Sequence, residues 1–248
     1  MTEKIFFRPK ELLRPLNNTL TIHTEDLLFL PRVRIFRDKD GYHLEIVTAS
    51  RYVLAQDVCD ELKTPETDGM EMLDIFQPAD PVAGFETELF FHEDEIDKLI
   101  EFCKSVKDLK TSPGSIAVME QLNSLTFTDE ATGQELTLAM QEQYQEMGAQ
   151  VTTNIALATT GLEDCGTKAY AVQPEFFARA KFLKREWDGV PFTFKFFENP
   201  RNGVTICVVK YGRLRLYVAG INLKTAFQSV QTSIGPAKVQ ECFWDNIS

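Results

Sequence analysis

The pattern of apolar and polar positions repeats along the chain. Three similar segments, FFRPKELLRPL, FFHEDEIDKLI and YAVQPEFFARA, begin at Phe6, Phe90 and Tyr170. In each, a short β-prone run precedes a glutamate and an apolar pattern of helical spacing, and two or three β-rich runs follow. Such self-similarity indicates a repeated structural unit. The sequence therefore predicts an α+β fold of β-α-β-β-β repeats, with helices on one face of antiparallel sheets. Chance similarity of three short amphipathic segments is the alternative.

The first two repeats are expected to form one domain, which spans residues 1–140. The helix of the first repeat is expected near residues 10–18, although Pro15 would kink or end it. Residues 31–58 alternate between apolar and polar positions around the sequence DKDG, which is typical of a hairpin turn. The acidic residues 59–84 contain prolines and are expected to form a connector over the surface.

The second repeat has a clearer helix, which is expected over residues 93–106. Its apolar positions Ile96, Leu99 and Cys103 fall on one helical face. Three short strands are expected after it, in residues 115–140. The second repeat therefore follows the same order of elements as the first.

The third repeat is expected to lie in a second domain, residues 141–248, with one clear unit and a C-terminal tail. Its segment PEFFARAKFLKREW has an apolar stripe at helical spacing, and three strands are expected in residues 191–221. The preceding residues 141–168 are expected to start as a loop or helical turn and then to form another strand.

The amino-acid composition limits which classes of protein this chain can belong to. A net charge of −11 excludes a surface that is basic all over, but it leaves room for a locally basic face. The five cysteines are widely spaced without a CxxC pair, which indicates reduced thiols. No apolar run is long enough to span a membrane, and the N-terminus lacks the pattern of a secretory signal. We therefore expect a cytoplasmic protein.

Residues with catalytic chemistry form no recognisable group in the sequence. The histidines His23, His43 and His92 are not spaced as a zinc-binding pair. Phosphate-binding loop, dinucleotide-binding and serine-hydrolase motifs are absent from the sequence. Cys103 and Cys207 lie in apolar patterns, whereas a cysteine nucleophile needs an exposed, electropositive setting. We expect a protein without catalytic activity, metal or cofactor.

Basic side chains gather on the predicted helices. The third helix carries them opposite its apolar stripe, the first has three around a single glutamate, and the second mixes lysines with acidic residues. A basic helix face in an acidic protein is expected where DNA phosphates are contacted, and a solvated face without a ligand is the alternative. The candidate DNA-binding residues are Arg8, Lys10, Arg14, Lys98, Lys104, Arg179, Lys181, Lys184 and Arg185.

Several segments resemble a known family. Residues 31–58 resemble two strands that end, in that family, in a pattern close to ATDxxRLA, which here reads TASRYVLA at residues 48–55. Residues 86–105 resemble the strand and helix that open the second half of a clamp domain. Residues 169–184 and 212–223 resemble the family's final helix and closing strand. Together these segments are similar to the sliding clamps of DNA replication, most closely the bacterial DNA polymerase III β type.

The chain also departs from the pattern of that family. Ser50 replaces the usual aspartate, and Val53 stands where the family has arginine. The closing strand reads Ala-Gly-Ile at residues 219–221 instead of Met-Pro-Val, and residues 224–248 follow it. Clamp domains have paired repeats, whereas three repeats are predicted here, so closure of a ring is open. A divergent, phage-encoded clamp would tolerate these differences.

The resemblance implies a polymerase processivity factor without chemistry of its own. It implies a homo-oligomeric ring closed by edge strands, with helices that touch the backbone of double-stranded DNA without reading its sequence. Partners would be a DNA polymerase and a clamp loader, held by short peptides in an apolar cleft. Carried onto this chain, the cleft residues are Arg51, Tyr52, Leu54, Val218 and Ile221; ordinary strand packing is the alternative for them.

Two other functions remain open from the sequence. A non-ring protein with the clamp fold could bind a replication or transcription partner, or DNA. An acidic structural or DNA-mimicking protein is the third reading. A clamp is expected to bind linear DNA weakly and to slide off its ends. A non-ring protein is expected to bind DNA equally well whether or not the ends are blocked. A DNA mimic is expected not to bind DNA.

Overall fold

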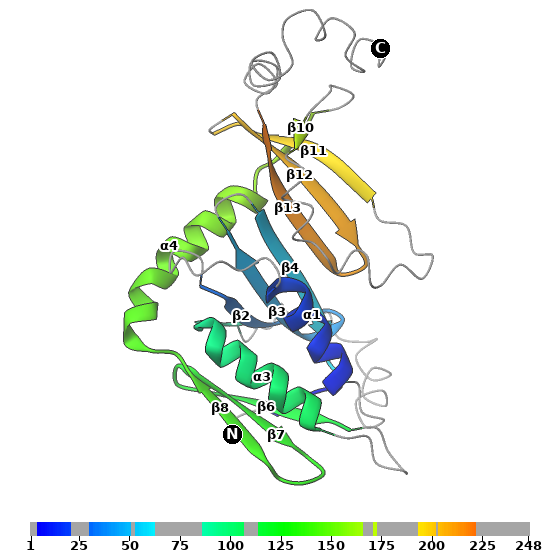
Figure 1. Cartoon of the computed structure of the whole chain (residues 1–248), viewed down its shortest axis with the longest axis vertical. Coiled ribbons are helices and arrows are strands. Elements are labelled where there is room, and N and C mark those ends of the chain that lie inside the picture. Colours follow the sequence, from blue (N-terminus) through cyan, green and yellow to red (C-terminus); the bar gives the residue numbers. More distant parts are fainter. Residues whose placement is uncertain are drawn as a thin grey trace, which may run out of the picture.

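The chain folds into antiparallel sheets with helices packed on them (Figure 1). The computed structural model describes residues 4–20, 30–50, 53–62, 86–106, 114–165, 171–172, 193–201 and 203–221. Its helices are α1 (Pro9–Leu20), α3 (Glu93–Ser105) and α4 (Glu142–Thr159). Its strands are β1 (Ile5–Phe7), β2 (Arg32–Asp38), β3 (Gly41–Ala49), β4 (Val53–Asp60), β5 (Glu86–Phe90), β6 (Ile116–Gln121), β7 (Ser124–Asp129), β8 (Glu135–Ala139), β9 (Glu163–Asp164), β10 (Ala171–Val172), β11 (Thr193–Asn199), β12 (Val204–Tyr211) and β13 (Leu214–Ile221).

The described strands form two sheets, and every pair among them is antiparallel. One sheet has the order β1-β6-β7-β8. The long sheet has the order β5-β2-β3-β4-β13-β12-β11-β9, and β10 pairs with β13. The predicted α+β class with β-α-β-β-β repeats is confirmed, because β1-α1-β2-β3-β4 and β5-α3-β6-β7-β8 follow that order. The division into domains 1–140 and 141–248 stays a prediction.

The first two repeats exchange their opening strands. β1 belongs to the first repeat but pairs with β6 of the second, with Ile5 opposite Val118. β5 belongs to the second repeat but pairs with β2 of the first, with Leu89 opposite Val33. Each sheet therefore contains a strand from the other repeat, so neither repeat completes its sheet alone.

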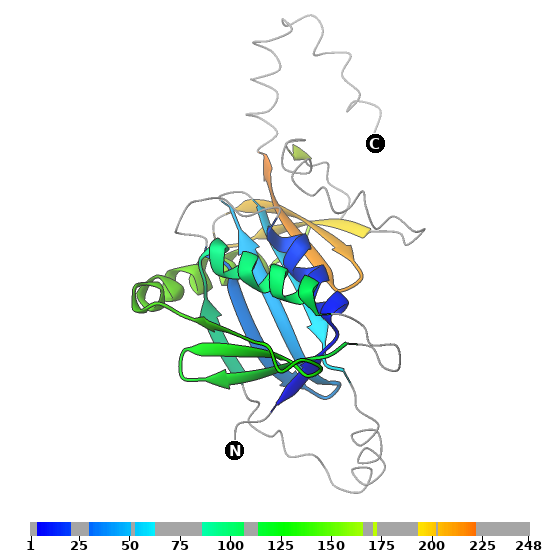
Figure 2. The same ribbon diagram turned by 60° about the horizontal axis from the view of Figure 1, so that its bottom comes forward.

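Helices α1 and α3 lie side by side on one face of the sheets (Figure 2). Their buried residues, such as Leu12 and Leu16 of α1 and Leu99 of α3, share one core with residues of both sheets, including Leu44 and Phe127. Because the apolar stripe of each helix meets this core, the opposite faces of α1 and α3 turn away from the sheets.

Helix α1 continues through Pro15 to Leu20. The expectation that Pro15 would end the helix is wrong, because tertiary packing compensates for the lost backbone hydrogen bond. Leu12 and Leu16 on either side of Pro15 are fully buried. The hydroxyl of Thr19 donates to the carbonyl of Pro15 at 2.7 Å, which supports the turn after the proline.

Helix α4 begins where a loop or helical turn was expected and continues through the segment expected to be a strand, so the strand prediction is wrong. Its buried residues Tyr144, Gly148, Val151 and Ile155 recur at helical spacing. They pack on the face of the long sheet opposite α1 and α3, where they meet apolar side chains of β3, β4, β12 and β13. The apolar stripe at helical spacing decides the structure of this segment, because it buries the helix on the sheet.

The strands expected for the third repeat are present as β11, β12 and β13. Strand β13 also pairs with β4 of the first repeat, with Tyr217 opposite Leu54. This pairing joins the first and third repeats into one long sheet (Figure 1). The helix expected for the third repeat lies outside the described residues.

Candidate functional sites

The outward side of α1 carries part of the candidate DNA-binding set. Arg8 and Lys10 are exposed. Arg14 is half-buried, and its guanidinium donates to Glu11 Oε2 at 3.1 Å and to the carbonyl oxygen of Val58 at 2.7 Å. Arg14 therefore attaches α1 to the end of β4 as well as contributing charge near the surface.

A buried carboxylate lies behind Arg14. The guanidinium of Arg14 approaches Asp57 Oδ1 at 3.6 Å, and Asn18 donates to Asp57 Oδ2 at 2.9 Å. Burial raises the pKa of Asp57, and the hydrogen bond from Asn18 and the charge of Arg14 oppose that shift. This cluster holds the helix to the sheet and explains why Arg14 is less exposed than Arg8 and Lys10.

The outward side of α3 is of mixed charge. Lys98 and Lys104 are exposed, but so are Asp97 and Glu101. Lys98 forms an ion pair with Glu95 at 2.5 Å, and this hydrogen bond raises the pKa of the Lys98 ammonium group. The remaining candidates Arg179, Lys181, Lys184 and Arg185 lie outside the described residues. Of the candidate DNA-binding residues that the structure describes, Arg8 and Lys10 are exposed at the start of α1 and Lys98 and Lys104 are exposed on α3.

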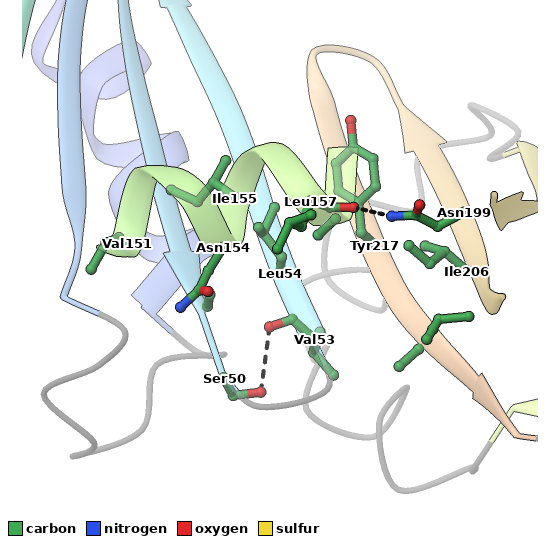
Figure 3. A pocket seen from close by; sticks show the side chains of 14 residues that line it. Ser50, Val53, Leu54, Val151, Asn154, Ile155, Leu157, Asn199, Ile206 and Tyr217 are labelled. Carbon is green, nitrogen blue, oxygen red and sulfur yellow. Dashed lines mark hydrogen bonds between the residues drawn. The ribbon is translucent and has the colours of Figure 1, made fainter. Parts of the chain in front are cut away.

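A cavity of about 300 Å³ lies between α4 and the junction of β4 with β13 (Figure 3). Its lining is mostly apolar. The residues that line it are Ala49, Ser50, Val53, Leu54, Val151, Asn154, Ile155, Leu157, Ala158, Asn199, Val204, Ile206, Tyr217 and Ala219.

Polar groups at the cavity are partly engaged with the backbone. Asn199 donates from its side chain to the carbonyl of Leu157 at 2.6 Å, which links the end of β11 to α4. The hydroxyl of Ser50 donates to the carbonyl of Val53 at 3.3 Å (Figure 3). A concave apolar surface with a few polar groups can hold an apolar side chain of a partner and fix its orientation.

The structure brings only part of the predicted cleft to this cavity. Leu54 lines it, but Val218 does not. Val218 belongs to an apolar cluster with Ala55 and Leu216 on the opposite face of the sheet. Because side chains alternate along a strand, Tyr217 and Ala219 reach the cavity instead. Arg51, Tyr52 and the side chain of Ile221 lie outside what the structure describes.

The prediction missed the wall of the cavity that α4 provides. Val151, Asn154, Ile155 and Ala158 come from this helix. Their helical spacing was present in the sequence. The position of helix α4 against β4 and β13 depends on contacts between distant segments, and a single sequence gives no pattern from which these contacts can be predicted.

A buried histidine elsewhere in the fold lies between two carboxylates, and Cys103 and Cys207 are buried. His43 is buried, with Nδ1 2.8 Å from Asp60 and Nε2 2.7 Å from Asp38. The hydrogen bond to His43 lowers the pKa of Asp38. Burial raises the pKa of Cys103 to about 12 and that of Cys207 to about 11, so neither thiol is suited to act as a nucleophile at neutral pH.

Within the described ranges, no group of three or more His, Cys, Asp or Glu side chains is arranged to hold a metal ion. None of the helices in this part of the chain is both long and apolar enough to cross a membrane. Within the described residues, the candidate sites are the outward side of α1 and α3 and the apolar cavity.

Sequence comparison gives no match, either to models of known protein families or to curated proteins. Comparison with solved structures gives matches to DNA polymerase sliding clamps. A DNA polymerase sliding clamp from Pseudomonas aeruginosa, crystallised with a ligand, superposes with a TM-score of 0.52 at 12% identity, covering 90% of this chain and 65% of that one. The beta subunit of a DNA polymerase of Streptococcus pyogenes gives a TM-score of 0.51 at 11% identity, with 89% and 65% covered.

The pol III beta of Caulobacter crescentus gives a TM-score of 0.52 at 9% identity, with 89% of this chain and 66% of that one covered. The chain thus spans about two thirds of the length of these proteins. At this level of identity the likeness concerns the fold alone. The chain has a clamp-like fold of the kind found in DNA polymerase III beta subunits.

Proposed function

We propose that this chain is a clamp-type processivity factor of DNA replication. Copies of it encircle or track duplex DNA without reading its sequence, and they hold a DNA polymerase and a clamp loader through short peptides. The single observation that carries this proposal is the apolar cavity at the β4–β13 junction. It lies beside residues 48–55 and the closing strand, where the family resemblance places a peptide cleft.

The proposed assembly gives each part of the chain a role. Residues 1–140 and 141–248 form two clamp domains, and a homo-oligomer of the chain provides the ring. The protein performs no chemistry and works in the cytoplasm of a cell that replicates phage DNA. The side of α1 and α3 that faces away from the sheets turns toward the DNA, with Arg8 and Lys10 as its basic start.

The DNA contact is tested by reversing charge on α1. We expect the double variant Arg8→Glu and Lys10→Glu to weaken binding to a linear duplex, because each lost phosphate contact reduces counterion release. The slope of log affinity against log salt concentration should fall in magnitude by about 2. The measurement is fluorescence anisotropy with a labelled duplex over a range of salt concentrations.

A matched control makes the same charge change on the face of the long sheet that α4 covers, opposite α1 and α3. Lys195→Glu with Lys210→Glu alters exposed lysines of β11 and β12, and the salt slope should stay unchanged. Blocking both duplex ends should slow dissociation if the chain tracks along DNA. Equal loss in the two double variants, or dissociation that ignores the blocked ends, would count against the clamp proposal.

The peptide cavity is tested by filling it. Peptides selected from a displayed random library on the wild-type chain provide the probe. Ala158→Trp places an indole on the α4 wall of the cavity and should weaken binding of a selected apolar peptide at least tenfold, which corresponds to about 1.4 kcal/mol. Ala156→Trp, on the same helix but not among the lining residues, should leave the affinity unchanged. If both variants bind the peptide like the wild type, the cavity is not the site.

A further inference from the structure

We propose that the sheet surface beside the cavity binds acidic residues of the same partner peptide whose apolar side chain enters the cavity. This surface consists of Lys195 of β11, Lys210 of β12 and Arg215 of β13, and it is called the basic patch below. The assignment rests on the proposed function, because both concern one peptide at one site. It gives the partner a chemistry, namely an apolar anchor residue with aspartate or glutamate a few residues away.

The basic patch lies on the same face of the long sheet as the cavity. Tyr217 and Ile206 line the cavity (Figure 3). On β13, Arg215 is the next residue on this face before Tyr217, and on β12, Lys210 is the second residue on this face after Ile206. At about 3.4 Å per residue these separations are about 7 and 14 Å. An extended peptide therefore reaches the basic patch within about two to four residues of a side chain held in the cavity.

Two cations of the basic patch face each other across neighbouring strands. Lys210 lies directly opposite Arg215 in the register of β12 with β13. Like charges in this position repel and destabilise the strand pair. Both residues are exposed, and among the described residues neither has a carboxylate as an ion-pair partner. A carboxylate of a ligand between them would remove the repulsion, so the arrangement favours an anionic ligand.

The cavity and the basic patch meet at Tyr217. Burial raises the pKa of the Tyr217 hydroxyl, and the charge of Arg215 and its hydrogen bond to Tyr217 oppose this shift. The Tyr217 hydroxyl also donates to Gln56 Oε1 at 3.4 Å. The tyrosine is thus held by polar groups on the side of the basic patch and presents its apolar surface to the cavity. One peptide can contact both surfaces without a gap between them.

The surroundings of the basic patch favour a short acidic peptide over a nucleic acid. Exposed carboxylates lie on either side of it, because Asp164 pairs with Lys195 at 2.9 Å and Asp60 pairs with Arg213 at 2.9 Å. A nucleic acid repeats its phosphates along the strand, so it would meet these carboxylates as well as the cations. The ring of Tyr217 is buried and offers no face for base stacking.

The net charge of the chain makes the basic patch selective. At −11, the chain as a whole repels an acidic peptide. Local cations beside the cavity attract its acidic residues and thereby orient the apolar anchor toward the cavity. Charges at the rim of an interface act mainly on the association rate and on the salt dependence of binding. We therefore expect the basic patch to distinguish peptides that share the same apolar anchor.

Three versions of the apolar peptide selected on the wild-type chain test this preference. All keep the apolar anchor, and they carry paired aspartates, serines or lysines beside it, on its N-terminal or C-terminal side in separate peptides. On the wild-type chain the aspartate version should bind at least tenfold more tightly than the lysine version at low salt. This ratio should shrink as salt is added, because salt screens exposed charges. The measurement is fluorescence anisotropy of the labelled peptides.

Charge reversal in the protein should invert the order of affinities. Lys210→Glu with Arg215→Glu should bind the lysine version more tightly than the aspartate version. Arg8→Glu with Lys10→Glu makes the same change of net charge on α1 and should keep the wild-type order. Lys210→Glu alone creates an opposite-charge pair with Arg215, so it should unfold at a urea concentration at least as high as the wild type. Any weakening of the aspartate peptide in this variant is then not due to unfolding.

Ala158→Trp separates this inference from the proposed function. It should weaken all three versions by the same factor, because it acts on the apolar anchor alone. If it does so while the three versions bind the wild type equally at low salt, the cavity is a peptide site and the basic patch is not part of it. If the order inverts on charge reversal while Ala158→Trp has no effect, one shared site is overturned.

A nucleic acid is distinguished with the labelled duplex. Lys210→Glu with Arg215→Glu should leave the affinity for the duplex unchanged. If the duplex and the aspartate peptide are weakened by the same factor, the basic patch binds nucleic acid and the inference is overturned.

Discussion

Replacing Arg32 with leucine is expected to lower the free energy of unfolding by about 3 to 5 kcal/mol, because it removes the nearest cation from a buried carboxylate, Glu45, whose other cation, Arg34, lies 4.0 Å away. Arg32 lies on β2 with its side chain only 8% exposed. Its guanidinium donates to Glu45 Oε2 on β3 at 2.8 Å and to Glu88 Oε1 on β5 at 2.7 Å. The Glu45 side chain is 4% exposed, so water replaces the lost partner poorly.

The effect should be specific to burial. Gln56 on β4 also donates to Glu45, at 2.5 Å, so the network connects four neighbouring strands of the long sheet. The matched control Lys195→Leu removes an exposed ion pair with Asp164 and should change stability by less than about 1 kcal/mol. The measurement is urea denaturation followed by circular dichroism.

A double variant separates the cost of an orphaned charge from the value of the pair. Replacing both Arg32 and Glu45 by leucine removes the buried carboxylate together with its cation. Replacement of both partners by apolar residues is often close to neutral. We therefore expect the double variant to recover more than half of the loss. If Arg32→Leu costs no more than Lys195→Leu, the buried network is not what holds these strands together.

The strands were predictable because their signals are local. The alternating pattern and the turn sequences placed β2, β3, β6, β7, β12 and β13 close to where they lie. Glycines at two of the turns have positive φ, 71° at Gly133 and 56° at Gly212, a conformation that favours glycine. Local propensity and turn chemistry therefore agree with the fold along most of the described strands.

The pairing between repeats was not predictable, because it depends on contacts between distant segments. The apolar patterns of β1 and β5 predict strands, but they do not predict that each strand pairs with the sheet of the other repeat. The same limit explains the cleft. The predicted cleft residue Leu54 lines the cavity, whereas Val218 points to the other face of the sheet. The register of β4 with β13, which places Tyr217 opposite Leu54, decides which residues of β13 face the cavity. One step along a strand exchanges its two faces.

Introducing valine at Gly148 is expected to destabilise the chain by about 1 to 3 kcal/mol and to displace α4 from the sheet. A Cβ atom at this position would lie 2.5 Å from Cδ2 of the Phe90 ring and closer still to Cε2. Phe90 is itself buried, so its ring has little room to move. Replacing glycine within a helix normally favours the helix by up to about 1 kcal/mol, so the sign of the effect depends on this overlap.

Two further variants identify the overlap as the cause. Ala149→Val changes the exposed neighbouring position on α4 and should have little effect on stability. Phe90→Ala is destabilising alone, but combined with Gly148→Val it provides space, so the two costs should be less than additive by about 0.5 to 3 kcal/mol. Because α4 forms one wall of the cavity, Gly148→Val should also weaken the peptide selected on the wild-type chain, whereas Ala149→Val should not. Strict additivity in the denaturation experiments, together with wild-type peptide affinity in Gly148→Val, would show that the close approach of α4 to β5 does not shape the cavity.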